Sequence, residues 1–237
     1  MDVARINFSH GTHDTDGFYI SAIRRVARSL GTHVPIMQDL AGPRMETATG
    51  HALDPQQRSG ITDKDLADLE FGIKNKVDYI AQSYVGGADD VLHLKAEIKR
   101  RSAETPIIAK IERQEAVDRF DDILKVADAI MIARGDLGLA VPIEDIPFLE
   151  RDMIVNAKRA GKPVITATQM MYTMVEHPEP TRAEVTDVAY AIVLGSDAVM
   201  LSDETARGAY PVQAVAMMER IVSRAERAGQ TMHVNPL

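Results

Sequence analysis

Two carboxylates and one lysine stand near the ends of two consecutive predicted strands, and this combination is well suited to binding a cation and an anion together. Residues 107–112 read I-I-A-K-I-E, and residues 128–136 read D-A-I-M-I-A-R-G-D. Strand side chains alternate between faces, so Lys110 and Glu112 share one face. Parallel neighbours lie about 5 Å apart, so Asp136 is expected close to Glu112. Oxygen ligands suit Mg²⁺, which usually binds one or two carboxylates plus a substrate.

The elements that would position these residues follow a repeated strand–helix pattern. Strands are predicted at residues 2–8, 34–38, 77–85, 107–112, 128–136, 163–168 and 197–201. Helices are predicted at residues 15–30, 62–73, 89–101, 114–126, 144–160, 182–194 and 211–228. Thr62 is the predicted N-cap of the second helix, and Gly31, Gly161 and Gly195 end three of the others. Repeated units of this kind predict a parallel sheet covered by helices.

The natural closure of such a chain is a (β/α)₈ barrel of about 250 residues. The pattern contains one unit fewer, so we expect a single α/β domain over residues 1–237 that is a TIM-type (β/α) barrel, incomplete or distorted relative to (β/α)₈. An open barrel leaves two strand edges without neighbours, and such edges invite association. The sequence therefore predicts a homo-oligomer or a distorted, closed seven-stranded barrel.

Composition excludes several classes of protein. The 237 residues contain no cysteine, carry a formal net charge of −8 and are 45% apolar. These values exclude disulfides and thiolate metal sites, argue against broad nucleic-acid binding, and do not fit a disordered chain. We find neither the roughly 18 consecutive apolar residues of a membrane span nor a signal-peptide pattern. The expectation is a soluble, cytoplasmic protein with no nucleic-acid or membrane partner.

Polar residues collect where the predicted strands end. In parallel barrels the active site lies at the carboxyl ends of the strands, and a purely structural barrel has no need of polar groups there. These residues are Asn7, Ser9, His10, Asp39, Ser83, Lys110, Glu112, Arg134, Asp136, Thr168, Gln169, Ser202, Asp203 and Glu204.

Several short motifs, in one order, cover nearly the whole chain. They are V-A-R-I-N-F-S-H-G at 3–11, Q-D-L-A-G-P at 38–43, I-T-D-K-D-L-A-D-L at 61–69, V-D-Y-I-A-Q-S-Y-V at 77–85, I-I-A-K-I-E at 107–112, I-A-R-G-D-L-G at 132–138, G-K-P-V-I-T-A-T-Q-M at 161–170, P-T-R-A-E-V-T-D-V-A at 180–189 and D-A-V-M-L-S-D-E-T-A at 197–206. Together they closely resemble the barrel domain of pyruvate kinase. The resemblance places residue 3 onward at the family's second barrel strand. It also implies that the family's first strand, its C-terminal domain and its lid domain are missing, with a short segment at residues 47–60 in the lid's place.

The resemblance implies a reaction and a set of roles. The reaction converts phosphoenolpyruvate and ADP to pyruvate and ATP through a Mg-bound enolate. Glu112 and Asp136 would hold Mg²⁺ or Mn²⁺, and Lys110 would stabilise the transferring phosphoryl group and the enolate oxygen. Thr168 would help to bind the substrate carboxylate and take part in protonating the enolate. Arg5 would contact the phosphoryl group.

Two further sites follow from the resemblance. The backbone N–H groups of Gly135 and Asp136 would face the substrate carboxylate at the beginning of a helix. A monovalent-cation site, for K⁺, would be formed by Asn7, Ser9, Asp39 and the carbonyl group of Leu40.

Two other functions stay open at this point. One is a metal-dependent enzyme that enolises pyruvate or a related 2-oxo acid, as an aldolase or decarboxylase does, without a nucleotide. The other is a truncated, non-catalytic paralogue.

Structural alternatives exist for the individual residues as well. Lys110, Glu112 and Asp136 would then be a salt-bridge cluster only. The methionines at 170, 171 and 174 are interpreted as core or interface packing, and the acidic runs at residues 63–68 and 121–122 as solvated helix faces.

Overall fold

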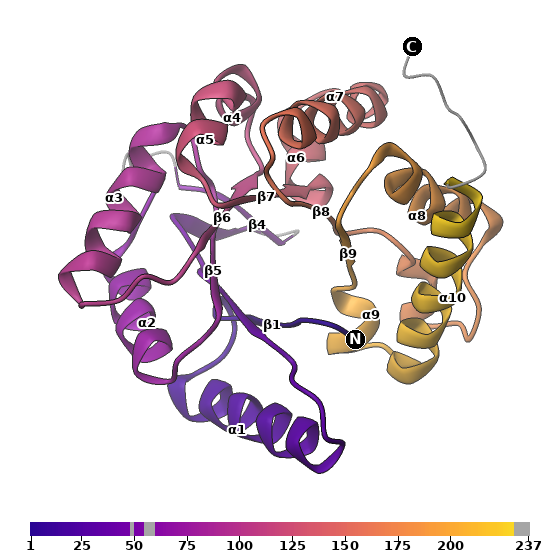
Figure 1. The fold of residues 1–237 in the computed structure, drawn as a ribbon. Coiled ribbons are helices and arrows are strands. Elements are labelled where there is room, and N and C mark those ends of the chain that lie inside the picture. Colours follow the sequence, from indigo (N-terminus) through magenta and orange to yellow (C-terminus); the bar gives the residue numbers. More distant parts are fainter. Residues whose placement is uncertain (48–49, 55–59, 230–237) are drawn as a thin grey trace. The chain divides into compact units, whose positions relative to one another are not determined.

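The chain divides into two compact units, Met1–Ile130 and Met131–Leu237. The computed structural model describes residues 1–47, 50–54 and 60–229. In both units strands alternate with helices along the sequence (Figure 1). The α/β fold class predicted from the sequence is therefore confirmed, whereas a single domain over residues 1–237 stays a prediction.

The first unit contains four parallel strands and an additional antiparallel pair. Its elements are β1 (Ala4–Asn7), α1 (His13–Ser29), β2 (Ile36–Asp39), β3 (Arg44–Thr47), β4 (Gly50–Leu53), α2 (Asp63–Lys74), β5 (Tyr79–Gln82), α3 (Ala88–Arg100), β6 (Ile107–Ile111), α4 (Gln114–Asp118) and α5 (Phe120–Val126). The strand order β1-β2-β5-β6 follows the sequence apart from β3 and β4, and each neighbouring pair is parallel. Helices α1, α2 and α3 line one side of these strands (Figure 1).

The second unit continues the alternation. Its elements are β7 (Ala129–Ala133, whose first two residues belong to the first unit), α6 (Arg134–Ala140), η1 (Ile143–Asp145), α7 (Ile146–Arg159), β8 (Val164–Ala167), η2 (Tyr172–Val175), α8 (Arg182–Leu194), β9 (Ala198–Met200), α9 (Asp203–Ala206) and α10 (Pro211–Gly229). The strand order is β7-β8-β9, and β8 pairs with β9 in parallel. The strands are short and largely apolar, as expected for parallel sheets.

Local sequence signals place several helix ends. Thr62 caps α2 as predicted, because its side chain accepts the Asp65 N–H while the Asp65 carboxylate accepts the Thr62 N–H. Thr181 and Glu184 form the same reciprocal capping box at the start of α8. Gly195 ends α8 with φ +111°, a left-handed conformation that glycine adopts without a steric penalty.

Three differences from the predicted elements change the local architecture. The predicted helix at 114–126 is two helices, because Arg119 interrupts the helical conformation between α4 and α5. The strand predicted at 128–136 ends at Ala133, so Asp136 lies in the first turn of α6. An antiparallel pair, β3 with β4, occupies part of the segment for which no regular structure was predicted.

The acidic run at residues 63–68 was predicted to be a solvated helix face, and that prediction was wrong for Asp65 and Asp68, whereas Asp63 is exposed. Asp65 and Asp68 are buried, with exposed fractions of 1% and 3%. Besides capping α2, Asp65 accepts the N–H of Gly42 at 3.0 Å. Asp68 hydrogen-bonds to His13 at 2.8 Å and pairs with Lys64. The carboxylates thus satisfy donors from other segments, which the helix sequence alone does not reveal.

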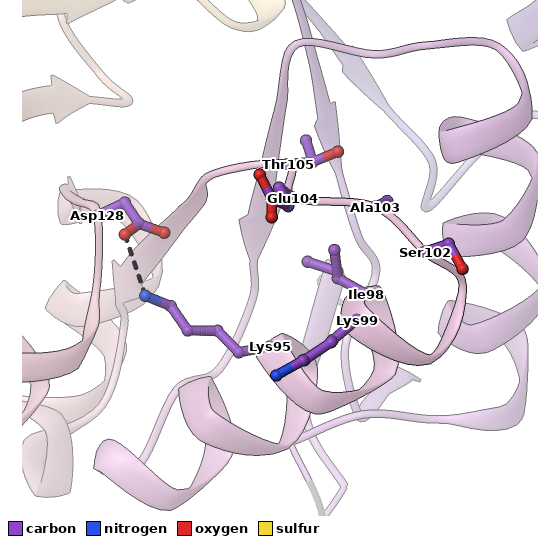
Figure 2. A pocket seen from close by; sticks show the side chains of 8 residues that line it. All are labelled: Lys95, Ile98, Lys99, Ser102, Ala103, Glu104, Thr105 and Asp128. Carbon is purple, nitrogen blue, oxygen red and sulfur yellow. Dashed lines mark hydrogen bonds and ion pairs between the residues drawn. The ribbon is translucent and has the colours of Figure 1, made fainter.

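A surface pocket of about 740 Å³ lies beside the start of β6 in the first unit (Figure 2). Lys95 reaches across it to Asp128, with an Nζ to Oδ1 distance of 3.0 Å. The other carboxylate oxygen of Asp128 accepts the N–H of Ile107 at 2.8 Å. The pocket is therefore at the end of β6 opposite to Glu112. Asp128, one of the residues that line it, fixes the beginning of that strand through its hydrogen bond to Ile107.

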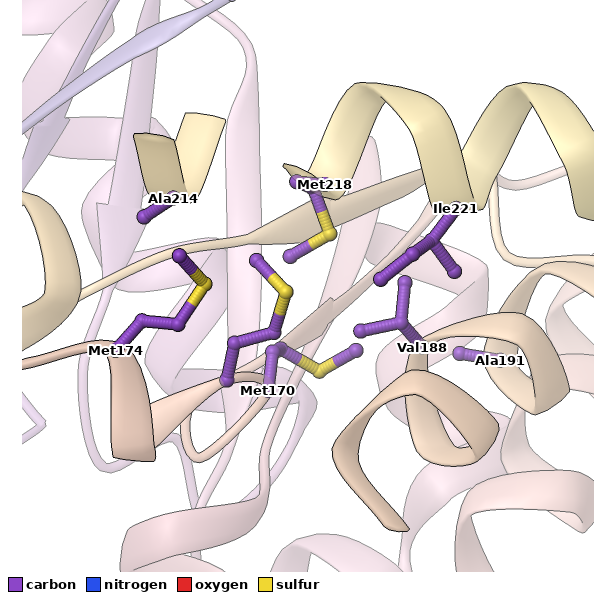
Figure 3. Close-up of a cluster of buried hydrophobic side chains, with 8 residues drawn as sticks. Met170, Met174, Val188, Ala191, Ala214, Met218 and Ile221 are labelled. Atoms are coloured by element: carbon purple, nitrogen blue, oxygen red, sulfur yellow. The ribbon is translucent and has the colours of Figure 1, made fainter. Parts of the chain in front are cut away.

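A methionine-rich cluster forms the core between α8 and α10 in the second unit (Figure 3). The side chains of Met170, Met174 and Met218 lie close to one another beside Val188 and Ile221. Unbranched thioethers fill irregular gaps of this kind well. The interpretation of the methionines as core packing is confirmed.

None of the helices in the described part of the chain is long and apolar enough to cross a membrane.

Candidate active site

Lys110 is the centre of a buried polar group in the first unit. Strands β2, β5 and β6 are neighbours in the sheet, so residues at their carboxyl ends meet. The Lys110 Nζ lies 2.7 Å from Ser83 Oγ, 3.1 Å from Asp39 Oδ1 and 2.9 Å from Glu112 Oε1. These partners can use all three of its N–H donors. The expectation that Lys110 and Glu112 share one face of the strand is confirmed.

Asp39 joins Lys110 to Arg5. It is the last residue of β2 and is only 1% exposed. Its Oδ2 lies 2.8 Å from Arg5 Nε and 2.6 Å from the Nη2 of the same guanidinium. Burial raises the pKa of Asp39, but the charges of Lys110 and Arg5 outweigh burial and hold that pKa below its ordinary value. Asp39 is thus an ionised link between two of the predicted catalytic residues.

Glu112 is held by the backbone as well as by Lys110. Its Oε2 accepts the N–H of Tyr84 at 2.6 Å. Tyr84 has φ +55°, a left-handed conformation that directs this N–H toward the carboxylate at the end of the neighbouring strand. Gly42, with φ +67°, packs here so tightly that a Cβ would lie 3.0 Å from the Cβ of Ser83. The left-handed turn at Tyr84, packed against Gly42, therefore helps to fix the orientation of Glu112.

The electrostatics of this group favour a permanently charged Lys110. Burial alone lowers the pKa of Lys110, but Asp39 and Glu112 raise it by more, so the pKa lies above its ordinary value. A lysine in that state does not act as a general base near neutral pH. It is suited to stabilising negative charge that develops on a nearby oxygen.

Thr168 and Gly135 form a second group, inside the second unit. The Thr168 hydroxyl accepts the N–H of Gly135 at 2.7 Å and donates to the carbonyl of Ala167 at 2.6 Å. Thr168 directly follows β8, and Asp136 follows Gly135 in the first turn of α6, where it is half-buried. The structure thus brings together Thr168 and one of the two N–H groups predicted to face a substrate carboxylate.

Arg134 is a residue of this second group for which the sequence predicted no role. Its guanidinium contacts Asp187 through two N–H groups, both at 2.6 Å, and Glu150 at 3.1 Å. It also donates to the carbonyl of Thr168 at 3.1 Å. The only sequence signal was its place directly after an apolar strand, because Glu150 and Asp187 are distant in the chain.

Comparison with known proteins identifies the family of this arrangement. The family model described as the barrel domain of pyruvate kinase matches residues 1–59 and 55–215. The chain belongs to the pyruvate kinase family. Its TIM-type barrel assignment follows from the same match, and the resemblance found in the motifs is confirmed.

Curated pyruvate kinases match most of this chain. A pyruvate kinase of Sporosarcina psychrophila and one of Geobacillus stearothermophilus are each 36% identical over 96% of the chain and 53% of their own length. Pyruvate kinase 2 of a Synechocystis species is 44% identical over 88% of the chain and 35% of its own length. The chain therefore spans about half the length of the first two relatives and about a third of the last.

The carboxylates of Glu112 and Asp136 are of the chemical type that a hard divalent cation binds. The carboxylate of Glu112 accepts Lys110 and the Tyr84 N–H, and carboxylate oxygen is the type of ligand that Mg²⁺ binds. Among the described residues no group of three or more His, Asp or Glu side chains could hold a metal. Mg²⁺ does not require such a group, since it usually takes one or two carboxylates with waters and substrate oxygens.

The residues predicted to bind a monovalent cation all lie in the first unit. Asn7 accepts the N–H of Ser9 through its side-chain oxygen at 3.1 Å. Leu40 is buried, and its N–H donates to the carbonyl of Ala81 at 3.0 Å. Asp39 already faces two cationic side chains, Lys110 and Arg5. K⁺ binding by this set stays a prediction.

Proposed function

We propose that this chain carries the phosphoryl-transfer site of a pyruvate kinase, converting phosphoenolpyruvate and ADP to pyruvate and ATP. The observation that carries the proposal is the buried, cationic Lys110, held between Asp39, Ser83 and Glu112 at the carboxyl ends of three adjacent strands. Membership of the pyruvate kinase family supports the same reaction.

In this proposal the phosphoryl group leaves the enol oxygen of phosphoenolpyruvate and bonds to a terminal phosphate oxygen of ADP. The electron pair of the broken P–O bond stays on the enol oxygen, and a proton then adds to the methylene carbon to give pyruvate. Lys110 stabilises negative charge on the phosphoryl and enolate oxygens, and Arg5 contacts the phosphoryl group. Thr168 orients the substrate carboxylate and takes part in the protonation. Such transfer depends on positioning and on charge neutralisation.

Glu112 and Asp136 are the proposed carboxylate ligands for Mg²⁺ or Mn²⁺. When bound, the divalent cation neutralises charge on the phosphoryl and carboxylate oxygens of the substrate. The ligand assignment is tested by Mn²⁺ titration followed by electron paramagnetic resonance. Glu112→Gln and Asp136→Asn should each weaken Mn²⁺ binding about tenfold or more, as expected for loss of a ligand. Unchanged binding in either variant would remove that residue from the site.

The reaction is tested with two assays on the same purified protein. One follows pyruvate formation from phosphoenolpyruvate and ADP, and the other follows Mg²⁺-dependent exchange of the pyruvate methyl protons for deuterium. Lys110→Met should lower both rates by roughly 10³-fold, because it removes the charge that faces the developing oxyanion. Lys95→Met is the matched control, since Lys95 lies in the pocket at the opposite end of β6. It should leave both rates unchanged.

The two assays also separate the proposed function from its alternatives. Proton exchange without phosphoryl transfer would indicate an enolising enzyme that works without a nucleotide. The absence of both activities in a folded sample would overturn the proposal and favour a non-catalytic paralogue.

We further propose that the protein assembles as a homo-oligomer in the cytoplasm, as the sequence predicted. Light scattering after size-exclusion chromatography tests the assembly, and a monodisperse monomer would contradict it.

A further inference from the structure

The backbone immediately after β8 adopts an unusual conformation. Thr168 and Gln169 are consecutive residues with φ values of +69° and +53°. Left-handed backbone costs about 1–2 kcal/mol per non-glycine residue, and for a β-branched residue such as threonine it is a genuine outlier. Strain of this kind persists only where the surrounding structure holds it. Some group must therefore fix Thr168 in place.

The consecutive residues Arg134 and Gly135 hold Thr168 from two sides. The Nη2 group of Arg134 donates to the Thr168 carbonyl at 3.1 Å, and the Gly135 N–H donates to the Thr168 hydroxyl at 2.7 Å. The same Nη2 lies 2.8 Å from the Met170 sulfur, two residues further along. One dipeptide thus contacts both the backbone and the reactive side-chain atom of Thr168.

Arg134 is itself rigidly held. Its side chain is 7% exposed, and the planar guanidinium makes a bidentate pair with Asp187 on α8. Glu150 on α7 accepts from its Nη1 at 3.1 Å. A bidentate guanidinium–carboxylate pair fixes geometry in a way that the single ammonium group of lysine cannot. The orientation of Thr168 is therefore linked to helices α7 and α8 through one buried arginine.

We propose that Arg134 is a positioning residue that sets the orientation of the Thr168 hydroxyl for the proton-transfer step. It does so through Thr168 and Gly135, without touching the substrate. The inference rests on the proposed function, in which Thr168 takes part in protonating the enolate, and it adds a residue to that machinery. Asp187 and Glu150 contribute by holding the guanidinium.

A double-mutant cycle in the proton-exchange assay tests the proposal. Arg134→Lys keeps the positive charge but loses the planar fork, and it should lower the exchange rate by about 100-fold, the effect of misplacing a reacting group by roughly 1 Å. In a Thr168→Val background, which lacks the hydroxyl, Arg134→Lys should have no further effect. Arg151→Lys, at an exposed arginine of α7 paired with Asp152, is the control.

Hydrogen exchange of the Gly135 amide gives a readout that needs no activity. Because this N–H donates to the Thr168 hydroxyl, both Arg134→Lys and Thr168→Val should increase its exchange rate about tenfold or more, while Arg151→Lys leaves it unchanged. Should Arg134→Lys fail to fold, Asp187→Asn, which removes the charge of the bidentate partner, should produce the same changes with smaller size.

The outcomes separate this inference from the proposed function. An inactive wild type with the expected amide changes would reject the proposed reaction and retain Arg134 as the residue that orients Thr168. Multiplicative effects of Arg134→Lys and Thr168→Val on the exchange rate, or an unchanged Gly135 amide, would overturn the positioning role.

Discussion

The Lys110→Met variant should be strongly destabilised although it keeps its fold. Lys110 faces two carboxylates, Asp39 at 3.1 Å and Glu112 at 2.9 Å, and all three side chains are buried. Methionine fills much of the space of the lysine stem, so little packing is lost and the cost is electrostatic. Removing one partner of a buried ion pair costs about 3–5 kcal/mol. Domains are typically stable by about 5–15 kcal/mol, so a folded but weakened protein is expected.

A second substitution tests whether charge is the cause. Asp39 keeps the guanidinium of Arg5 when Lys110 is removed, whereas Glu112 loses the cation that pairs with it at 2.9 Å. Adding Glu112→Gln to Lys110→Met should therefore restore part of the lost stability. The recovery equals the coupling energy of the pair, about 0.5–3 kcal/mol for contacting residues, minus the cost of Glu112→Gln alone. In the wild type, Glu112→Gln should be destabilising. A substitution that destabilises the wild type and stabilises the Lys110→Met variant is the signature of a paired charge.

Urea denaturation at pH 7.5, followed by far-UV circular dichroism, measures these differences. The Lys95→Met control removes a half-exposed ion pair and should cost less than about 1 kcal/mol. Burial lowers the pKa of Lys110, but the two carboxylates raise it by more, so the pKa of the folded state lies above 10.5. The stabilising contribution of Lys110 is therefore present below pH 10.5 and is lost as the pH rises through the folded-state pKa. A cost below 1 kcal/mol for Lys110→Met, or no recovery in the double variant, would refute this account of the charge cluster.

Three further perturbations test other parts of the molecule. Burial raises the pKa of Asp39, but Lys110 and Arg5 lower it by more, so the contribution of Asp39 to the stability of the fold is lost as the pH falls below 3.8. The Asp39→Asn variant should therefore have a markedly lower melting temperature at pH 7 and only a slightly lower one at pH 3. Gly42→Ala should cost about 1–3 kcal/mol in urea, because φ is +67° and the new Cβ would lie 3.0 Å from Ser83; a neutral result would contradict the strain. Burial raises the pKa of Glu150 despite Arg134, so its contribution is favourable below pH 4.5 and is lost as the pH rises. Glu150→Gln should therefore be less destabilising at pH 8 than at pH 4, and equal effects at the two pH values would contradict this.

The sequence predicted those features that depend on neighbours in the chain. Thr62 caps α2 through a residue three positions away, and Gly195 ends α8 through its own backbone. The alternation of strand side chains places Lys110 beside Glu112 for the same reason. Each of these signals is contained in a window of a few residues.

Features that depend on distant partners were missed. The acids at 65 and 68 look like solvated helix residues in sequence, but Asp65 accepts the N–H of Gly42 and Asp68 hydrogen-bonds to His13. Arg134 acquires its role from Asp187 and Thr168, which are 53 and 34 positions away. The partly buried ion pair between Arg5 and Asp39 was likewise absent from the predictions. A single sequence carries no direct signal for such pairings.

The two ends of the segment between β2 and α2 are held by hydrogen bonds that do not depend on the length of the segment. The Gly42 N–H is held by Asp65, the Asp54 N–H donates to the carbonyl of Pro43 at 2.8 Å, and the Gly60 N–H contacts Asp90 at 3.3 Å. Closing a flexible loop costs only about 0.6 kcal/mol more for each doubling of its length. The same base would therefore tolerate either the short hairpin β3–β4 or a whole inserted domain. Gain or loss of an insertion here is thermodynamically cheap, so evolution can exchange one for the other without rebuilding the barrel beneath.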